Sequence, residues 1–280
     1  MRKPAVAGSF YDGSAAGLRR QIEDCFKHPL GPGALPGSAM VVGRRILGLV
    51  SPHAGYIYSG PVAANGFFQI AAEGKPQTVV ILGPNHRGLG AAVAVGGQDA
   101  WQTPLGSVEI DVEVGQAIVS ATRWARLDDL AHSMEHSIEV QVPFLQYIYE
   151  NGFRIVPISM LRQDWEVSRE LGRAVAAALK GKNAVIIASS DFSHYESQSM
   201  ASKKDHLALE AILNLEPERL EETVISHSIT MCGPGPVMSM LTACKALGSK
   251  KARLLRYATS GDITGDHSQV VGYASVEVTA

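Results

Sequence analysis

The sequence predicts a single-domain α/β protein in which a central mixed sheet is flanked by helices. Apolar runs of strand length alternate with stretches of helical periodicity through most of the chain, as expected for a sheet covered by helices. The loop-rich segment 29–43 comes too early to separate two domains. We therefore expect one domain over residues 1–280.

Seven segments are predicted strands because they are short runs of mainly apolar residues: 46–52, 78–83, 91–96, 153–159, 184–190, 253–259 and 269–278. Eight segments show helical periodicity: 14–27, 60–73, 112–123, 138–150, 164–180, 198–214, 218–225 and 235–246. In the helix expected at 164–180, for example, apolar residues recur every four positions from Val167 to Leu179. This spacing places them on one face of the helix.

The composition is that of an ordinary globular protein, with 46% hydrophobic and 19% charged residues among 280. A formal charge of −2 gives no electrostatic reason to expect nucleic acid or an anionic membrane as a partner. No apolar run approaches the ~20 residues that span a bilayer, and the first ten residues do not look like a secretory signal. Three irregularly spaced cysteines suit a reducing compartment. We expect a cytoplasmic protein.

Three predicted strands end directly in a turn that carries a histidine, namely His53, His86 or His194. Ligands of open α/β sheets bind outside the carboxyl ends of the strands, so these three side chains are expected near one point. Imidazole is the commonest protein ligand for transition metals. A metal site is therefore the leading hypothesis, although each histidine taken alone is more often structural.

Further candidates lie beside these turns. Asp191 stands three residues before His194 and could bind a metal or orient an imidazole, while His194 could act as a general acid or base. Capping of the next helix would explain the neighbouring serines but not His194. Cys232 lies in a Gly/Pro-rich loop before a predicted helix, where a thiol has a depressed pKa and readily binds metal. Cys25 and Cys244 lie within helical periodicity and are expected in the core.

A competing pattern runs from His132 to His136, since His-Ser-Met-Glu-His matches the H-x-x-E-H signature of inverted zinc proteases. The pattern is short, and residues 128–131 give no clear helix start before it. We therefore favour a position for His136 at the rim or in the second shell of the same pocket. No glycine-rich stretch matches a nucleotide-binding motif, so no nucleotide cofactor is expected.

Assembled, these residues resemble the Memo family, the middle member of the AMMECR-type, Memo and radical-SAM grouping. The resemblance extends from the first residues to the last third of the chain. Its landmarks are PAVAGSFY at 4–11, PHAGY at 52–56, LGPNH at 82–86, EHSIE at 135–139, SSDFSH at 189–194 and the Cys232-Gly233 loop.

The resemblance implies the fold of the class III extradiol dioxygenases, with a metal at the strand ends. It implies that His53, His86 and Cys232 ligate the metal, and that His194 is the acid/base histidine with Asp191 next to it. His136, Tyr56 and Asn85 are then expected in the second shell or at the substrate. The dioxygenases use two histidines and a glutamate, so a cysteine as third ligand puts ring cleavage in doubt.

The sequence therefore leads to three hypotheses. The first is a metal-dependent redox enzyme with one metal ion, iron being favoured and copper or zinc the alternatives, in which His194 moves protons. The second is a binding module whose cleft captures a small anion, a peptide or a partner protein without turnover. The third is metal storage or buffering. Expected partners are a small-molecule or peptide ligand in the cleft, and the AMMECR-type and radical-SAM proteins of the same system.

Overall fold

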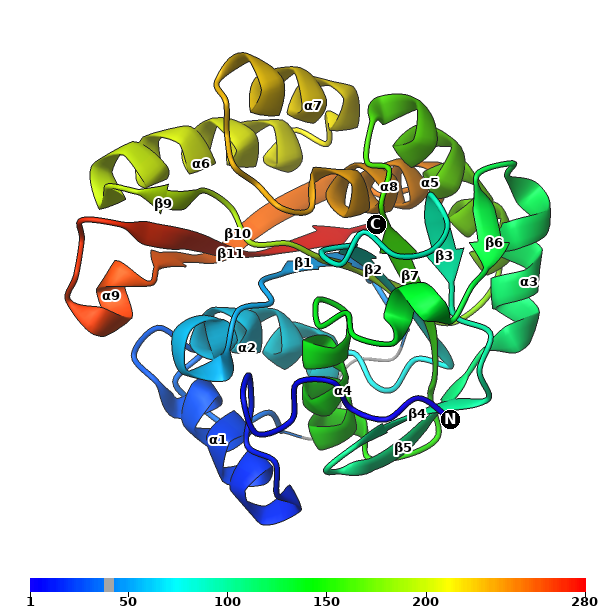
Figure 1. Cartoon of the computed structure of the whole chain (residues 1–280), viewed down its shortest axis with the longest axis horizontal. Coiled ribbons are helices and arrows are strands. Elements are labelled where there is room, and N and C mark those ends of the chain that lie inside the picture. The colour runs from blue at the N-terminus through cyan, green and yellow to red at the C-terminus, as the bar shows by residue number, and fades with distance from the viewer. Residues whose placement is uncertain (38–42) are drawn as a thin grey trace.

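The computed structural model describes residues 1–37 and 43–280, and its centre is an eleven-stranded mixed sheet (Figure 1). The main path of the sheet runs β10-β11-β1-β8-β2-β7-β3-β6, and β4, β5 and β9 pair beside it. The strands are β1 (Ile46–Ser51), β2 (Thr78–Pro84), β3 (Val93–Val95), β4 (Ala100–Thr103), β5 (Gly106–Ile110), β6 (Ala125–Leu127), β7 (Arg154–Met160), β8 (Ala184–Ser189), β9 (His194–Glu196), β10 (Lys251–Thr259) and β11 (Val270–Thr279).

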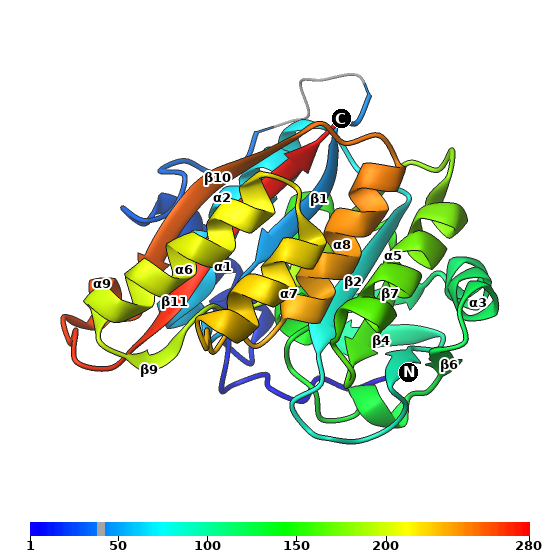
Figure 2. The ribbon, with the colours of Figure 1, turned by 90° about the horizontal axis from the view of Figure 1, so that it is seen from above.

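Helices cover both faces of this sheet. In Figure 1, α1, α2 and α4 lie below it, and Figure 2 shows α5, α6, α7 and α8 across the opposite face. The helices are α1 (Ala15–Lys27), α2 (Tyr56–Ala72), α3 (Val112–Ala121), α4 (Val142–Tyr149), α5 (Trp165–Leu179), α6 (Gln198–Leu213), α7 (Pro217–Ser226), α8 (Pro234–Ala246) and α9 (Gly261–Thr264), with 3₁₀ turns at Leu130–His132 and Glu139–Gln141.

The four central strands are parallel and buried on both faces. β8 pairs in parallel with β1 on one side and with β2 on the other, and β2 pairs in parallel with β7. Every residue of β2 and β8 is buried, which explains their uninterrupted apolar sequences. Because β1, β8 and β2 are adjacent and parallel, their carboxyl ends meet at one edge of the sheet, and the loops that follow them meet there too.

All seven expected strands and all eight expected helices are present, which confirms the predicted single-domain α/β fold. Helix α2 begins at Tyr56, earlier than expected, and carries Pro61 inside the helix. The segment expected as a helix at 138–150 is a 3₁₀ turn followed by α4. Within the loop-rich segment 29–43, residues 29–37 and 43 form neither helix nor strand, and 38–42 lie outside the described residues. None of the described helices is long and apolar enough to cross a membrane.

Arg2, near the start of the chain, binds the segment 130–139, which precedes α4. Arg2 is only 4% exposed, and its guanidinium donates to the carbonyls of His132 (2.6 Å) and Glu135 (2.7 Å). The same group pairs with Glu139 at 2.7 Å and lies 4.2 Å from the ring centre of Trp101. A buried guanidinium is stable only when its donors are satisfied in this way. The N-terminus therefore holds the 130–139 segment in place.

Glu139 is the acceptor at the centre of this arrangement and has no exposed surface. Besides the Arg2 ion pair, its carboxylate accepts from the backbone amides of Ala5 (2.8 Å) and Val6 (3.1 Å) and from the Tyr11 hydroxyl (2.6 Å). These charge-assisted hydrogen bonds join residues more than 120 positions apart in the sequence. The N-terminal segment therefore helps to hold in place the loops at the sheet edge where His53 and His86 lie.

Candidate metal centre

Three side chains that resemble metal ligands meet at the carboxyl ends of β1 and β2. His53 follows β1, His86 follows β2, and Cys232 lies in the loop before α8. One ligand atom from each lies within 4.8 Å of the others, and His53 Nε2 is 3.2 Å from Cys232 Sγ. Figure 1 looks onto the loops at this edge. Cys232 lies more than 140 residues after both histidines in the sequence, and the fold brings the three together. His53 is 2% exposed, whereas the side chain of His86 is about one-third exposed and opens the site to solvent.

Hydrogen bonding fixes which nitrogen of His53 faces the site. The Ser189 hydroxyl donates its proton to the carbonyl of Ser137 (2.6 Å) and accepts a hydrogen bond from the Gln141 side chain (2.8 Å). Its remaining contact with His53 Nδ1, at 2.9 Å, therefore has the imidazole as donor. Nδ1 carries the proton, and Nε2 presents a lone pair toward Cys232. Burial and the neighbouring histidines lower the pKa of His53 well below its usual value, so the ring stays neutral.

Glu135 orients His86 in the same sense. Glu135 is 1% exposed, and its Oε1 lies 2.9 Å from His86 Nδ1, so that nitrogen donates and Nε2 is left for a metal. The carboxylate also accepts from the backbone amides of His86 (2.6 Å), His136 (2.9 Å) and Ser137 (2.9 Å). Burial alone would raise the pKa of Glu135, but the hydrogen bonds and charge of His86 outweigh it, so the pKa lies well below its usual range.

Replacing Glu135 by glutamine tests this orienting role. Glu135→Gln keeps the size of the side chain but weakens the acceptor for His86 Nδ1, and loss of such a partner lowers metal affinity by about 10- to 100-fold. Competition titration with a chromophoric chelator measures the change. Glu73→Gln is the matched control. Glu73 is also a buried carboxylate that accepts backbone amides (Arg45 and Ile46), but it lies at the C-terminal end of α2, beside the start of β1 and away from the site. Equal affinities for the two variants would contradict the role assigned to Glu135.

The surroundings of Cys232 favour its protonated thiol in the metal-free protein. Burial, followed by the charge of Asp191, raises the pKa of Cys232 above its usual value. The depressed pKa expected from a position before a helix is therefore wrong for the apoprotein, because desolvation outweighs any effect of α8. The backbone amide of Asp191 points at Sγ from 3.2 Å and would stabilise the thiolate. Metal binding at this site should thus release a proton.

Asp191 and His194 lie beside the three donors. Asp191 is 4% exposed, accepts from the backbone amide of His53 at 2.8 Å, and has its other oxygen 4.0 Å from His53 Nε2. Burial raises its pKa to about 6. His194 Nδ1 lies 2.9 Å from the carbonyl of Thr230 and donates to it, so Nε2 is the basic nitrogen. Among the described residues, none forms a hydrogen bond with that Nε2.

The structure brings His136 into the same cluster. Its ring stacks on that of His86 with a centroid separation of 4.6 Å. It is nearly perpendicular to the His53 ring at 5.5 Å and tilted by 49° to the Phe10 ring at 4.7 Å. Its Nδ1 is buried and has no hydrogen-bond partner among the described side chains and backbone. Burial lowers the pKa of His136 to about 4, so it is a neutral imidazole at neutral pH.

Tyr56 and Asn85 are both engaged in holding loops. The Tyr56 hydroxyl donates to the carbonyl of Val140 at 2.6 Å, and the ring is 2% exposed. The Asn85 side chain donates to the carbonyl of Leu89 and accepts from the amides of Arg87 and Gly88, which closes the turn after β2. Contact of either residue with a substrate stays a prediction.

The H-x-x-E-H pattern does not form the helix that a zinc protease needs. Residues 130–132 are a short 3₁₀ turn, and His132 is buried with Nε2 donating to the carbonyl of Ala94 at 3.1 Å. Burial lowers the pKa of His132 to about 4. His136 instead groups with His86 and Glu135. The two histidines of the pattern therefore serve different parts of the fold.

Comparison with known proteins agrees with the sequence motifs over the whole chain. The model of the family described as "Memo-like protein" matches residues 2–277. The chain belongs to the Memo family. A "MEMO1 family protein" of Methanothermobacter thermautotrophicus is 49% identical over 276 residues, covering 98% of this chain and 99% of the relative. A "MEMO1 family protein" of Methanopyrus kandleri is 50% identical over 278 residues and covers 98% of each chain.

A solved structure also shares the fold of this Memo family chain. It is the crystal structure of an uncharacterized protein, JW3007, from Escherichia coli K12, with a TM-score of 0.56 and 15% sequence identity. The likeness covers 83% of this chain and 99% of that protein. At this identity the likeness concerns the fold alone.

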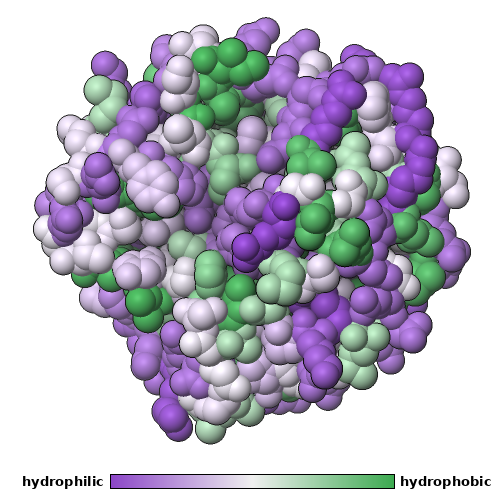
Figure 3. All heavy atoms as spheres, viewed as in Figure 1, coloured by the Kyte–Doolittle hydropathy of each residue, from purple (hydrophilic) through white to green (hydrophobic). Residues whose placement is uncertain are grey.

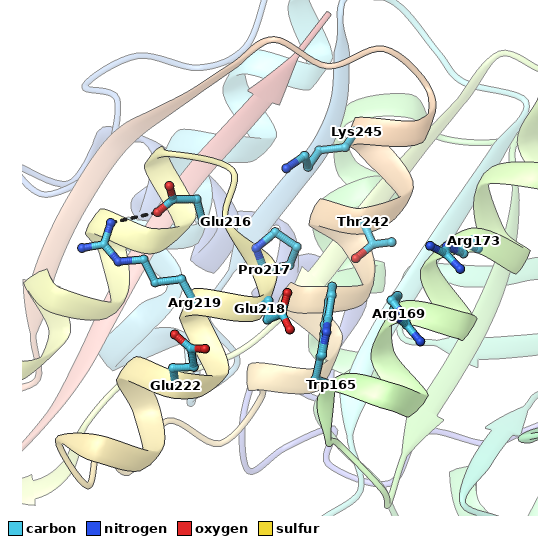
Figure 4. A pocket seen from close by; sticks show the side chains of 10 residues that line it. All are labelled: Trp165, Arg169, Arg173, Glu216, Pro217, Glu218, Arg219, Glu222, Thr242 and Lys245. Carbon is cyan, nitrogen blue, oxygen red and sulfur yellow. Dashed lines mark hydrogen bonds and ion pairs between the residues drawn. The ribbon is translucent and has the colours of Figure 1, made fainter.

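One cavity of the structure lies away from the histidine cluster. It has a volume of about 520 Å³ and lies between α5, α7 and α8 (Figure 4), with the acidic side chains of Glu218 and Glu222 on α7 and the basic ones of Arg169 and Arg173 on α5. Glu216 and Arg219 on its rim pair with each other at 2.9 Å. Neither histidine nor cysteine lines this cavity. Among the described residues of this Memo family chain, the groups that could hold a metal therefore lie at the sheet edge and not in this cavity.

Sequence reasoning missed the residues that orient the ligands. Glu135 entered only as part of the protease pattern and of the family landmark at 135–139, and Ser189 only as part of a cap or motif. Gln141, which donates to Ser189 and to the carbonyl of Pro52, gave no signal of its own. A buried polar residue inside an otherwise apolar segment is the signal that could have found it.

Proposed function

We propose that the chain is a metal-dependent redox protein of the cytoplasm, with one metal ion held by His53, His86 and Cys232. Iron is the favoured metal, with copper as the alternative, since two imidazoles and a thiolate suit both. The observation that supports the proposal most directly is the convergence of these three donors within 4.8 Å at the strand ends.

The spacing of the donors fits a bound cation. Typical metal–sulfur and metal–imidazole bonds of about 2.3 and 2.0 Å at a tetrahedral angle put the two ligand atoms roughly 3.5 Å apart. His53 Nε2 and Cys232 Sγ are 3.2 Å apart. Both imidazoles also have Nδ1 bonded to an acceptor, Ser189 or Glu135, which leaves Nε2 of each ring as the ligand atom.

The remaining groups are arranged for proton transfer beside the cation. A bound iron or copper ion would supply one-electron chemistry and Lewis acidity to a small molecule in the cleft. The partly exposed side of His86 gives that molecule access. His194 would take a proton at Nε2, because Nδ1 is already committed to Thr230. Asp191, whose pKa is about 6, would hold or release a second proton near neutral pH.

Turnover in a His194 variant tests this assignment. In the metal-loaded protein we expect oxygen consumption with a catechol or another reductant, and we expect His194→Gln to lower the rate about 100-fold or more while metal content is unchanged. An oxygen electrode and metal analysis on the same sample give both quantities. His206→Gln on the exposed side of α6 is the control and should keep the wild-type rate.

The outcomes separate the classes of function. Metal-replete protein without oxygen consumption would contradict the redox proposal and leave metal buffering, or binding of a peptide, an AMMECR-type protein or a radical-SAM protein. Equal rates for wild type and His194→Gln would leave the metal centre standing but remove His194 from the proton path.

A further inference from the structure

Tyr195 occupies a backbone conformation that its side chain disfavours. Its φ is +59°, in the left-handed region that aromatic residues rarely adopt. It is the middle residue of β9, where the pairing with β11 is irregular: His194 pairs with Val271 and Glu196 with the neighbouring Val270. This two-against-one pairing is a β-bulge, a device often found beside active sites. Glycine would fit the position without steric cost.

The fold gains little from the tyrosine ring at this position. The residue is 75% exposed, the largest exposed fraction of any of the exposed large hydrophobic residues in the described chain. It is not part of any of the three hydrophobic clusters. Strain that is retained without a packing gain points to a functional constraint on the side chain.

The ring lies beside His194, the proposed proton-transfer residue of the candidate metal centre. Its centroid is 5.9 Å from that of His194, with the two planes at 60°. Asp191, which accepts from the backbone amide of His53 and donates its own amide to Cys232 Sγ, lies four residues before Tyr195 in the same segment. Tyr58 is 39% exposed at the start of α2, immediately beyond the His53 turn. Figure 3 shows this face of the molecule with a hollow just left of its middle, beside strongly hydrophilic atoms.

We propose that Tyr195 is a specificity-determining residue that contacts a planar group of the molecule bound at the metal centre. The ligand class is a small molecule with oxygen donors for the metal and a flat ring for the tyrosine. The bulge turns the ring outward beside His194, where stacking or edge contact with such a group becomes available. This inference rests on the proposed metal site at His53, His86 and Cys232.

Two hydroxamate chelators test the inference, one with a methyl group and the other with a phenyl ring in its place. Acetohydroxamate and benzohydroxamate offer the same two oxygen donors, and zinc loading avoids redox chemistry during calorimetric titration. We expect wild type to bind benzohydroxamate more tightly than acetohydroxamate. Tyr195→Gly should weaken benzohydroxamate binding about three- to tenfold, the range for one aromatic contact. Its acetohydroxamate affinity should stay at the wild-type value.

Two further variants separate the ring from the backbone. Tyr195→Phe keeps the ring and should keep the wild-type preference. Glu150→Gly relieves the same kind of strain (φ +56°) at the end of α4 and should leave both affinities unchanged. Neither glycine variant should unfold at a lower temperature than wild type, because glycine suits both positions.

The role of Tyr195 would be overturned if Tyr195→Gly kept the wild-type ratio of benzohydroxamate affinity to acetohydroxamate affinity. It would also be overturned if Glu150→Gly lowered that ratio by the same factor as Tyr195→Gly. Failure of wild type to take up zinc before the titration is a different result. It would contradict the metal site itself and with it the proposed function.

Discussion

Replacement of Cys232 by alanine is expected to abolish tight metal binding, with a loss of affinity of about 100-fold or more. The thiolate is the only anionic donor among the three ligands, and it faces His53 Nε2 at 3.2 Å. Loss of an oriented outer partner alone costs about 10- to 100-fold, and in the proposed site Cys232 would be a direct donor. Metal analysis of anaerobically purified protein measures the effect as metal per chain.

Cys25→Ala is the matched control for this variant. Cys25 is a buried thiol in α1 that contributes to the core and not to the metal centre. It should keep the metal content of the wild type. Full metal occupancy in Cys232→Ala would remove Cys232 from the ligand set, and equal metal loss in both variants would point to general misfolding.

Glu139→Ala is expected to lower the free energy of unfolding by about 3–5 kcal/mol, the usual cost of removing one partner of a buried ion pair. The variant leaves the Arg2 guanidinium buried without its anion and removes the acceptor for two backbone amides and the Tyr11 hydroxyl. Urea unfolding of the metal-free protein at neutral pH measures the change.

Glu210→Ala provides the comparison, because Glu210 pairs with Arg219 on the surface, where such pairs contribute at most about 1 kcal/mol. A Glu139→Ala variant as stable as Glu210→Ala would contradict the role of the N-terminal segment. Arg2 also donates to the carbonyl of Glu135, so we expect Glu139→Ala to weaken metal binding as well.

The central strands of the sheet could be predicted because their burial is visible in a short continuous stretch of sequence. β2 and β8 are buried on both faces, so their sequences are apolar without interruption. The hairpin of β4 and β5 was missed because its strands are short and are separated only by Pro104 and Leu105, with Gly106 at the start of β5, so the segment resembles a loop. β9 was missed because its pairing with β11 covers only three residues and includes the bulge at Tyr195.

The candidate site likewise has a part that the sequence could predict and a part that it could not. The sequence could predict that His53 and His86 follow strands whose carboxyl ends share one edge of the sheet. The part of Cys232 was implied by the family resemblance. The orientation of the imidazoles could not be predicted, because it depends on contacts such as that between His86 and Glu135, which are 49 residues apart. The pKa of Cys232 was misjudged because burial, which the sequence does not show, dominates it.

The most direct test of the account is X-ray absorption spectroscopy at the metal edge of protein purified without oxygen. The account predicts about one metal per chain, with one sulfur ligand near ~2.3 Å and two imidazole nitrogens near ~2.0–2.1 Å, as such bonds usually measure. A metal shell without sulfur, or protein that binds no metal when iron or copper is supplied, would contradict it.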